Sequence, residues 1–135
     1  LKQCDRAGVQ FLGNVENMPE LLGSISLLVY PSYYPEGLPK ILAEAAAAGI
    51  PVVTTDHPGC RDAIVDGCSG LLTTPRDTED LARAISYLLD DPRVRMEMGR
   101  FAIAYARENY DVAKIVDQHF LLYQSMLSRK TVKKK

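Results

Sequence analysis

Short apolar runs alternate along the chain with longer stretches in which apolar residues recur at helical spacing. Each short run stops at glycine, proline or a polar turn, which is typical of strands. The runs that we expect to form strands are residues 9–12, 26–30, 51–55 and 70–74. This alternation predicts an α/β fold, with a parallel sheet covered by helices on both faces.

Helix boundary residues support the same division of the chain. Asn17 precedes Met18-Pro19 and predicts the start of a helix there, because asparagine caps helices and proline is tolerated in their first turn. The other helices are expected at residues 38–48, as a short turn at 60–63, and at residues 78–89, 92–109 and 112–127. The carboxyl-terminal part is therefore predicted to be helical.

The composition is that of an ordinary globular domain. The chain has 135 residues, of which 47% are hydrophobic and 24% charged. It has no apolar run near the ~20 residues that span a bilayer, and its start lacks the layout of a signal peptide. Cys4, Cys60 and Cys68 have spacings that fit no zinc or redox motif. We expect a cytoplasmic protein with reduced thiols and no metal or other cofactor.

The net charge of −1 hides an uneven distribution. Residues 129–135 hold five of the sixteen basic residues, so residues 1–128 carry eleven bases against seventeen acids, about −6. We therefore divide the chain into a domain at 1–128 and a basic tail at 129–135, and we expect no nucleic-acid partner. The tail is either merely solvated or in peripheral contact with an anionic membrane surface, such as the bacterial inner membrane.

The loop after the second expected strand carries the chemistry that the sequence shows best. In parallel sheets, ligands bind beyond the carboxyl ends of the strands. Here the loop delivers Glu36 and Gly37 to that edge, followed by the amino end of the 38–48 helix, where free amides favour a phosphate. The alternative for Glu36 is that it only caps this helix.

Glu44 lies in the same helix among alanines and aliphatic residues, which is typical of a buried helix. A pair with Lys40 contributes only a few tenths of a kcal/mol at this spacing, whereas an unpaired buried carboxylate costs several kcal/mol. We expect ligand hydroxyls, such as the two of a ribose, to complete it. Glu36 and Glu44 would then bracket a nucleotide-diphosphate sugar.

These segments resemble one family closely. VQFLGNV, LLVYPSYYPEGLPKILAEAAAAGIPVVTT and DGCSGLL are similar to the donor-binding lobe of the retaining glycosyltransferases of family 4, over residues 9–125. The two glutamates separated by seven residues are the most specific element. The resemblance implies a Rossmann-like domain, the carboxyl-terminal lobe of a GT-B fold. It also implies a catalytic Glu36 that contacts the donor sugar, and donor-binding roles for Glu44, Gly37, Leu38, Lys40, Ile41, Gly13 and Asn14.

The sequence also departs from the family. Pro39 replaces a glycine and removes one N–H, and the family's glycine turn is here Pro58-Gly59-Cys60-Arg61-Asp62. The glycine-rich loop, its arginine and lysine, and the amino-terminal acceptor lobe are not found. We therefore expect a fragment of a longer enzyme that transfers sugar with retention in bacterial polysaccharide or glycolipid synthesis, and a fragment that is inactive alone.

Several other residues have two interpretations each. His57 is a ligand contact or a solvent-facing loop residue, and Arg61 binds phosphate or pairs with Asp62 or Asp66. The Asp90-Asp91 pair is interpreted as helix capping. Tyr33 and Tyr34 stack on a ligand or fill the rim of the core. The alternative functions are a nucleotide-sugar epimerase or hydrolase of the same architecture and a non-catalytic regulatory module.

Overall fold

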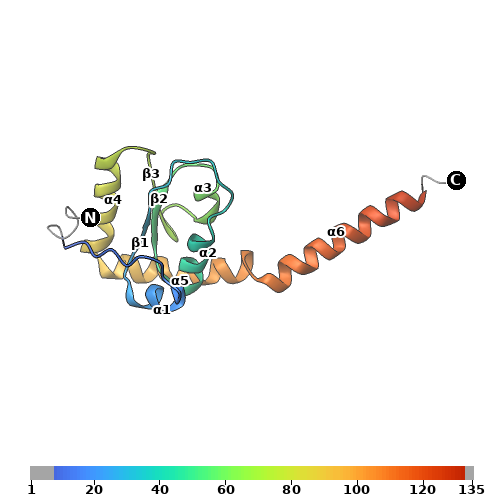
Figure 1. Cartoon of the computed structure of the whole chain (residues 1–135), viewed down its shortest axis with the longest axis horizontal. Helices are drawn as coiled ribbons and strands as arrows, with labels where there is room; N and C mark the ends of the chain where they lie inside the picture. The colour runs from blue at the N-terminus through green and yellow to red at the C-terminus, as the bar shows by residue number, and fades with distance from the viewer. Residues whose placement is uncertain (1–7, 133–135) are drawn as a thin grey trace.

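Three parallel strands form the sheet of the computed structural model, which describes residues 8–132 and the side chains of residues 8–128 (Figure 1). The strands are β1 (Leu28–Tyr30), β2 (Val52–Thr55) and β3 (Gly70–Thr73), in that order. Helix α2 (Lys40–Ala48) connects β1 to β2, and the short α3 (Cys60–Ala63) connects β2 to β3. All three carboxyl ends therefore lie at one edge, and the predicted α/β class is confirmed.

Helices cover both faces of the sheet. Successive strand residues point to opposite faces, so the apolar strands present side chains for helices to pack against on each face. Leu28 and Val52 pack in a cluster with Leu42 of α2 and Leu22 of α1 (Met18–Ser24). Val53 packs on the other face, in a cluster with residues of α4 (Thr78–Asp90) and α5 (Pro92–Asn109). Helix α2 is thus fixed to the sheet by the burial of its apolar side chains.

Small residues bring α2 and α5 together. Ala46 of α2 is buried in one cluster with Ala102 and Ala106 of α5. A Cβ on Gly99 would lie 2.3 Å from the carbonyl oxygen of Gly49, the residue that ends α2. Only a residue without a side chain allows this approach. Helix α2 is therefore held from its second side as well.

Helix caps lie where the sequence predicts them. The Oδ1 atom of Asn17 accepts a hydrogen bond from the Glu20 amide at the start of α1. Asp91 accepts hydrogen bonds from the amides of Arg93 and Val94, and these bonds hold the pKa of Asp91 below its usual value. The capping interpretation is confirmed for Asp91.

The strand expected at residues 9–12 is wrong. These residues form no strand, and the side chain of Phe11 is 75% exposed. A strand forms only where a neighbour accepts and donates its backbone hydrogen bonds, and no described strand pairs with this segment. The strand at β1 is also shorter than predicted.

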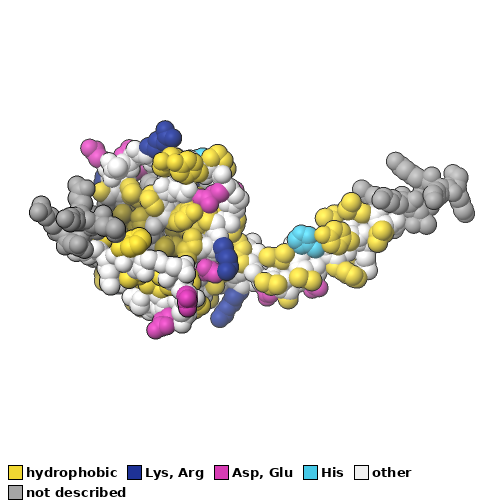
Figure 2. Space-filling model, in the orientation of Figure 1, with side chains coloured by type: hydrophobic (Ala, Val, Ile, Leu, Met, Phe, Trp, Pro, Cys, Tyr) yellow, Lys and Arg dark blue, Asp and Glu magenta, His cyan; other side chains and the backbone are white. Residues whose placement is uncertain are grey.

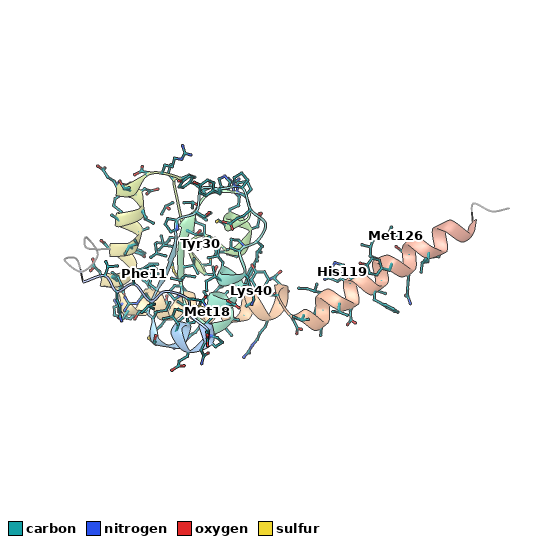
Figure 3. The ribbon with its side chains drawn as sticks, viewed as in Figure 1. Phe11, Met18, Tyr30, Lys40, His119 and Met126 are labelled. Carbon is teal, nitrogen blue, oxygen red and sulfur yellow. The ribbon has the colours of Figure 1, made fainter. Side chains whose placement is uncertain are left out.

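The last helix, α6 (Val112–Val132), leaves the body of the domain (Figure 1). Its described apolar side chains are exposed, and His119 and Met126 lie on the part that is clear of the body (Figure 3). The basic side chains of the predicted tail at 129–135 lie outside the described residues. Among the described residues, no helix has both the length and the apolarity needed to cross a membrane.

Candidate functional site

The amino end of α2 lies at the carboxyl edge of the sheet and is free of a side-chain cap. Pro39 is the capping residue, and no side chain of the described residues forms a capping hydrogen bond with the first turn. The Leu42 amide donates to the Pro39 carbonyl at 3.0 Å, while the amides of Lys40 and Ile41 precede the first intrahelical bonds. The alternative of Glu36 as a helix cap is therefore wrong, and this helix end can accept an anion.

Glu36 is held by Tyr30, the last residue of β1. The Tyr30 hydroxyl lies 3.1 Å from one carboxylate oxygen of Glu36 and 3.2 Å from the other, and donates to them. Burial of Tyr30, and next the nearby carboxylate, raise the pKa of this phenol, so it remains a donor at neutral pH. Figure 3 labels Tyr30 within the body of the domain. The Glu36 side chain is thereby oriented at the carboxyl edge.

Glu44 differs from the expectation of a deeply buried carboxylate. Its side chain is 33% exposed, and its Oε1 atom lies 3.0 Å from Nζ of Lys40. The Lys40 side chain is 89% exposed, so the pair is at the surface and contributes little stability. The desolvation argument made from the sequence is wrong, because α2 has one face open to solvent. What remains is a carboxylate one turn into the helix, with acceptor capacity beyond its one ion pair.

Gly59 brings the loop after β2 against the loop that carries Glu36. Its φ is +87°, and a Cβ there would lie 2.4 Å from the Gly37 carbonyl oxygen and 2.5 Å from that of Glu36. Its amide donates to a carboxylate oxygen of Asp62 at 3.1 Å. The sequence identifies Gly59 as a turn residue. It does not show the contact of Gly59 with the loop that carries Glu36, since the two segments are distant in the chain.

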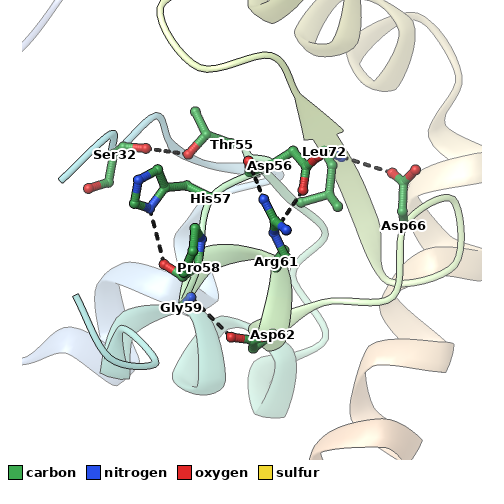
Figure 4. A network of polar contacts seen from close by, with 10 residues as sticks. All are labelled: Ser32, Thr55, Asp56, His57, Pro58, Gly59, Arg61, Asp62, Asp66 and Leu72. Atoms are coloured by element: carbon green, nitrogen blue, oxygen red, sulfur yellow. Dashed lines mark hydrogen bonds and ion pairs between the residues drawn. The ribbon is translucent and has the colours of Figure 1, made fainter. Parts of the chain in front are cut away.

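The loop after β2 is stabilised by bonds within itself (Figure 4). Nε of Arg61 lies 2.9 Å from Oδ1 of Asp56, and its Nη2 donates to the Asp56 carbonyl. The pairs expected for Arg61 with Asp62 or Asp66 are therefore wrong. Asp66 instead accepts from the amide of Leu72 (Figure 4). The path of the loop in three dimensions determines the partners of Arg61 and Asp66, and the pattern of residue types along the chain does not show this path.

His57 and the two loop tyrosines are bound to neighbouring groups. Nδ1 of His57 lies 3.2 Å from the carbonyl oxygen of Pro58 (Figure 4). The rings of Tyr33 and Tyr34 have centroids 4.5 Å apart, and both side chains are exposed. The tyrosines therefore do not fill the core, and their stacking on a ligand stays a prediction.

Gly13 and Asn14 are not joined to Glu36 and Glu44, which we call the acid pair. Both lie in exposed coil, and no hydrogen bond or ion pair of the described residues connects them to Glu36 or Glu44. Their expected contact with a base stays a prediction. The structure brings Glu36, Gly37 and Leu38 to the strand edge immediately before α2, with Lys40 and Ile41 in its first turn.

Comparison with known proteins decides the family. The model of the glycosyl transferases group 1 matches residues 5–105. The chain belongs to this family. It is 32% identical over 94% of its length to N,N'-diacetylbacillosaminyl-diphospho-undecaprenol alpha-1,3-N-acetylgalactosaminyltransferase of Campylobacter jejuni. It is also 35% identical over 76% of its length to glycogen synthase of Mycobacterium tuberculosis.

Solved structures with the same fold include nucleotide complexes. The chain matches Alr3699/HepE of Anabaena in complex with UDP with a TM-score of 0.85 and 30% identity, over 92% of this chain and 35% of that one. A complex of the same protein with UDP-glucose matches with a TM-score of 0.83. The chain spans 33% of the Campylobacter transferase and 25% of the glycogen synthase. It therefore corresponds to about a third or less of these glycosyltransferases.

Proposed function

We propose that this chain is the donor-binding part of a longer, two-lobed glycosyltransferase and binds a nucleotide-diphosphate sugar. The observation that carries the proposal is the free amino end of α2, with Glu36 just before it and Glu44 one turn inside it. An open helix end suits a diphosphate, and the two carboxylates suit hydroxyl donors on either side of it. The likeness to a protein solved with UDP supports the same assignment.

Each site residue has a proposed role. Glu44 accepts hydrogen bonds from the ribose hydroxyls while it keeps its pair with Lys40. The amides around Leu38, Lys40 and Ile41 face the sugar and diphosphate, with Gly37 beside them, and the Lys40 ammonium adds positive charge. Glu36, oriented by Tyr30, accepts from a hydroxyl of the donor sugar. The transfer proceeds with retention and uses no metal ion.

The acceptor lies on an amino-terminal lobe, and the complete enzyme works in the cytoplasm on bacterial glycans. The Campylobacter relative is named for an acceptor on a diphospho-undecaprenol carrier. We propose the same class of acceptor here, a sugar on an isoprenoid diphosphate, which places the work at the membrane surface. We expect no turnover by the chain alone, because helix-end amides and Lys40 are the only groups of the proposed site that stabilise a leaving diphosphate, and such electrostatic stabilisation is usually the largest catalytic contribution.

The test is a transfer assay with radiolabelled UDP-sugars, UDP-glucose and UDP-N-acetylgalactosamine, in the complete enzyme. Label should move to an isoprenoid-diphosphate-linked sugar only when that acceptor is present, and nuclear magnetic resonance of the product should show the donor's anomeric configuration. Free or epimerised sugar released without the acceptor would support the hydrolase or epimerase instead. The isolated chain should bind UDP without turnover.

Tyr30→Phe should lower the transfer rate about tenfold, because the hydroxyl that orients both oxygens of Glu36 is removed. UDP affinity should stay within twofold, since Glu36 is assigned to the sugar. The measurement is kcat and KM of the complete enzyme beside the dissociation constant of UDP. Tyr87→Phe, an exposed tyrosine of α4, is the matched control. An unchanged kcat in Tyr30→Phe would show that Glu36 needs no such support.

A further inference from the structure

The loop that carries Glu36 is positioned by side-chain contacts. Residues 31–38 lie between β1 and α2, and none of them takes part in a backbone–backbone hydrogen bond of the described structure. Near the start of the loop, the Thr55 hydroxyl donates to the Ser32 carbonyl oxygen. The contacts of Glu36 described above hold the other end. Tyr33 lies between these two anchors, so its contacts decide how firmly the middle of the loop is held.

The ring of Tyr33 is not fixed by burial. Its side chain is 40% exposed, and it lines a cavity of about 220 Å³ at the carboxyl edge of the sheet. Leu81 of α4 and Thr73 at the end of β3 line the same cavity, whereas Glu36 and Glu44 do not. The cavity leaves open space beside the ring, so another contact must hold Tyr33 in place.

Arg76, in the loop after β3, supplies that contact. The central carbon of its guanidinium lies 4.7 Å from the centroid of the Tyr33 ring, within the roughly 6 Å at which a cation is attracted to an aromatic face. The Tyr33 hydroxyl lies 3.3 Å from that of Tyr34, so the contact extends to the second tyrosine of the loop. At this end of the molecule Figure 2 shows basic side chains in dark blue beside hydrophobic ones in yellow, a class that includes tyrosine.

The backbone of Arg76 indicates that its side chain is used. Its φ is +66°, and no other non-glycine among the described residues has a positive φ. Glycine adopts this conformation freely, whereas a residue with a side chain does so at a cost. Such conformations cluster at functional sites, where the surrounding structure enforces them. An arginine at a position that suits glycine therefore points to a role for the guanidinium.

The guanidinium acts on the Tyr33 ring and not through an ion pair. In the described part of the chain no carboxylate forms an ion pair with Arg76. The neighbouring Asp77 lines the same cavity, and its carboxylate accepts from the amides of Glu79 and Asp80. The charge of Asp77 offsets that of Arg76, so the two together select no anion. The position of the guanidinium over the ring is the feature that requires an explanation.

We propose that Arg76 is a positioning residue for sugar transfer: its guanidinium holds Tyr33 and thereby the loop that presents Glu36 to the donor sugar. The proposal rests on the proposed function for the role of Glu36, and Arg76 itself touches no substrate. A cation–π contact at an exposed site contributes a factor of about two to five to a conformational equilibrium. Without the contact, the held arrangement of the loop becomes less populated by that factor.

The first test measures the loop in the absence of any ligand. Nuclear magnetic resonance relaxation of the isotope-labelled chain reports the mobility of the Glu36 and Gly37 amides. These amides should become more mobile in Arg76→Gln. Arg93→Gln is the control, because this arginine of α5 pairs with Asp91 and does not line the cavity. Equal mobility of the loop in the unaltered chain and in both variants would overturn the proposal.

The second test measures transfer by the complete enzyme. Arg76→Gln should lower kcat about two- to fivefold and leave the dissociation constant of UDP unchanged. Arg76→Gly should lower kcat equally, while its melting temperature should not fall, because glycine suits a φ of +66°. A loss of kcat without a loss of stability separates positioning from folding. An unchanged kcat in both variants would refute the positioning role.

Variants of the ring test whether Arg76 acts through Tyr33. Tyr33→Phe keeps the aromatic face and should retain the kcat of the unaltered enzyme, whereas Tyr33→Leu should lower kcat as much as Arg76→Gln does. The double variant Arg76→Gln/Tyr33→Leu should be no slower than either single variant, because both changes remove one contact. A loss in Tyr33→Leu that Arg76→Gln does not share would assign the ring to a ligand and contradict the proposal.

The unaltered protein tests the proposed function in the same experiments. If the complete enzyme binds no UDP and transfers no sugar, the proposed function fails, and the mobility of the loop still decides whether Arg76 holds it. If the enzyme transfers sugar and both Arg76 variants match it, the proposed function stands and the positioning role fails.

Discussion

Gly59→Ala is expected to slow sugar transfer by the complete enzyme about 100-fold. A methyl group at this position would lie 2.4 and 2.5 Å from two carbonyl oxygens of the loop that carries Glu36. Backbone atoms cannot yield as a flexible side chain does, so the loop must move by several tenths of an ångström or more. Displacements approaching 1 Å in a catalytic group can cost about 100-fold in rate. The measurement is kcat with a saturating donor.

Gly67→Ala is the matched control for this prediction. Gly67 also has a positive φ, +72°, but a Cβ there meets nothing within 4 Å. Both variants place alanine at a positive φ, at a cost of about 1–2 kcal/mol. The ψ of −54° at Gly59 raises this cost further, and only Gly59→Ala adds the contact. Equal transfer rates in the two variants would show that the contact of Gly59 with the Glu36 loop does not affect sugar transfer.

Glu44→Gln is expected to weaken UDP binding to the chain at least tenfold. Hydrogen bonds to a charged group contribute about 1.5–3 kcal/mol each, and an amide replaces the charge while it keeps the shape. Calorimetry, or the shift in melting temperature caused by UDP, measures the loss. Without UDP the melting temperature should change little, because the pair with Lys40 lies at the surface.

Lys40→Gln separates the ion pair from the proposed ligand contact. This variant removes the pair and the charge that Lys40 adds near the diphosphate, but it leaves the Glu44 carboxylate in place, so it should weaken UDP binding less than Glu44→Gln does. A carboxylate whose sole purpose is to hold Lys40 would give equal effects in the two variants.

Local patterns are sufficient to predict much of this fold. The apolar runs of β2 and β3, the caps at Asn17 and Asp91, and Gly49 after α2 each act within a few residues of themselves. Their positions are therefore readable in the chain. The acid pair and the helix amino end follow from the same local order, which is why the candidate site is visible in the sequence.

The errors arise where distant residues decide the outcome. Residues 9–12 have the composition of a strand, but a strand needs a neighbour, and none of the described strands pairs with them. The burial of Glu44 depends on which face of α2 packs on the sheet. Alanines lie on all sides of this helix, so the sequence does not indicate that face. The contact of Gly59 with the Glu36 loop joins segments more than twenty residues apart.

Arg76 shows a different limit of sequence reasoning. An arginine after Pro75 in a polar turn looks like any solvated charge. Its positive φ and its position over Tyr33 become evident only when the turn is built in three dimensions. The loops after β1 and β3 must both be placed before this contact is visible.

The most direct measurement of the central claim is a double-mutant cycle on the ribose contact. Dissociation constants are determined for UDP and 2′,3′-dideoxy-UDP, each with the chain and with Glu44→Gln. If the carboxylate binds the two hydroxyls, each single change weakens binding at least tenfold and the second change adds little to the first. Two losses that simply multiply, or a dideoxy nucleotide that binds as tightly as UDP, would contradict the account.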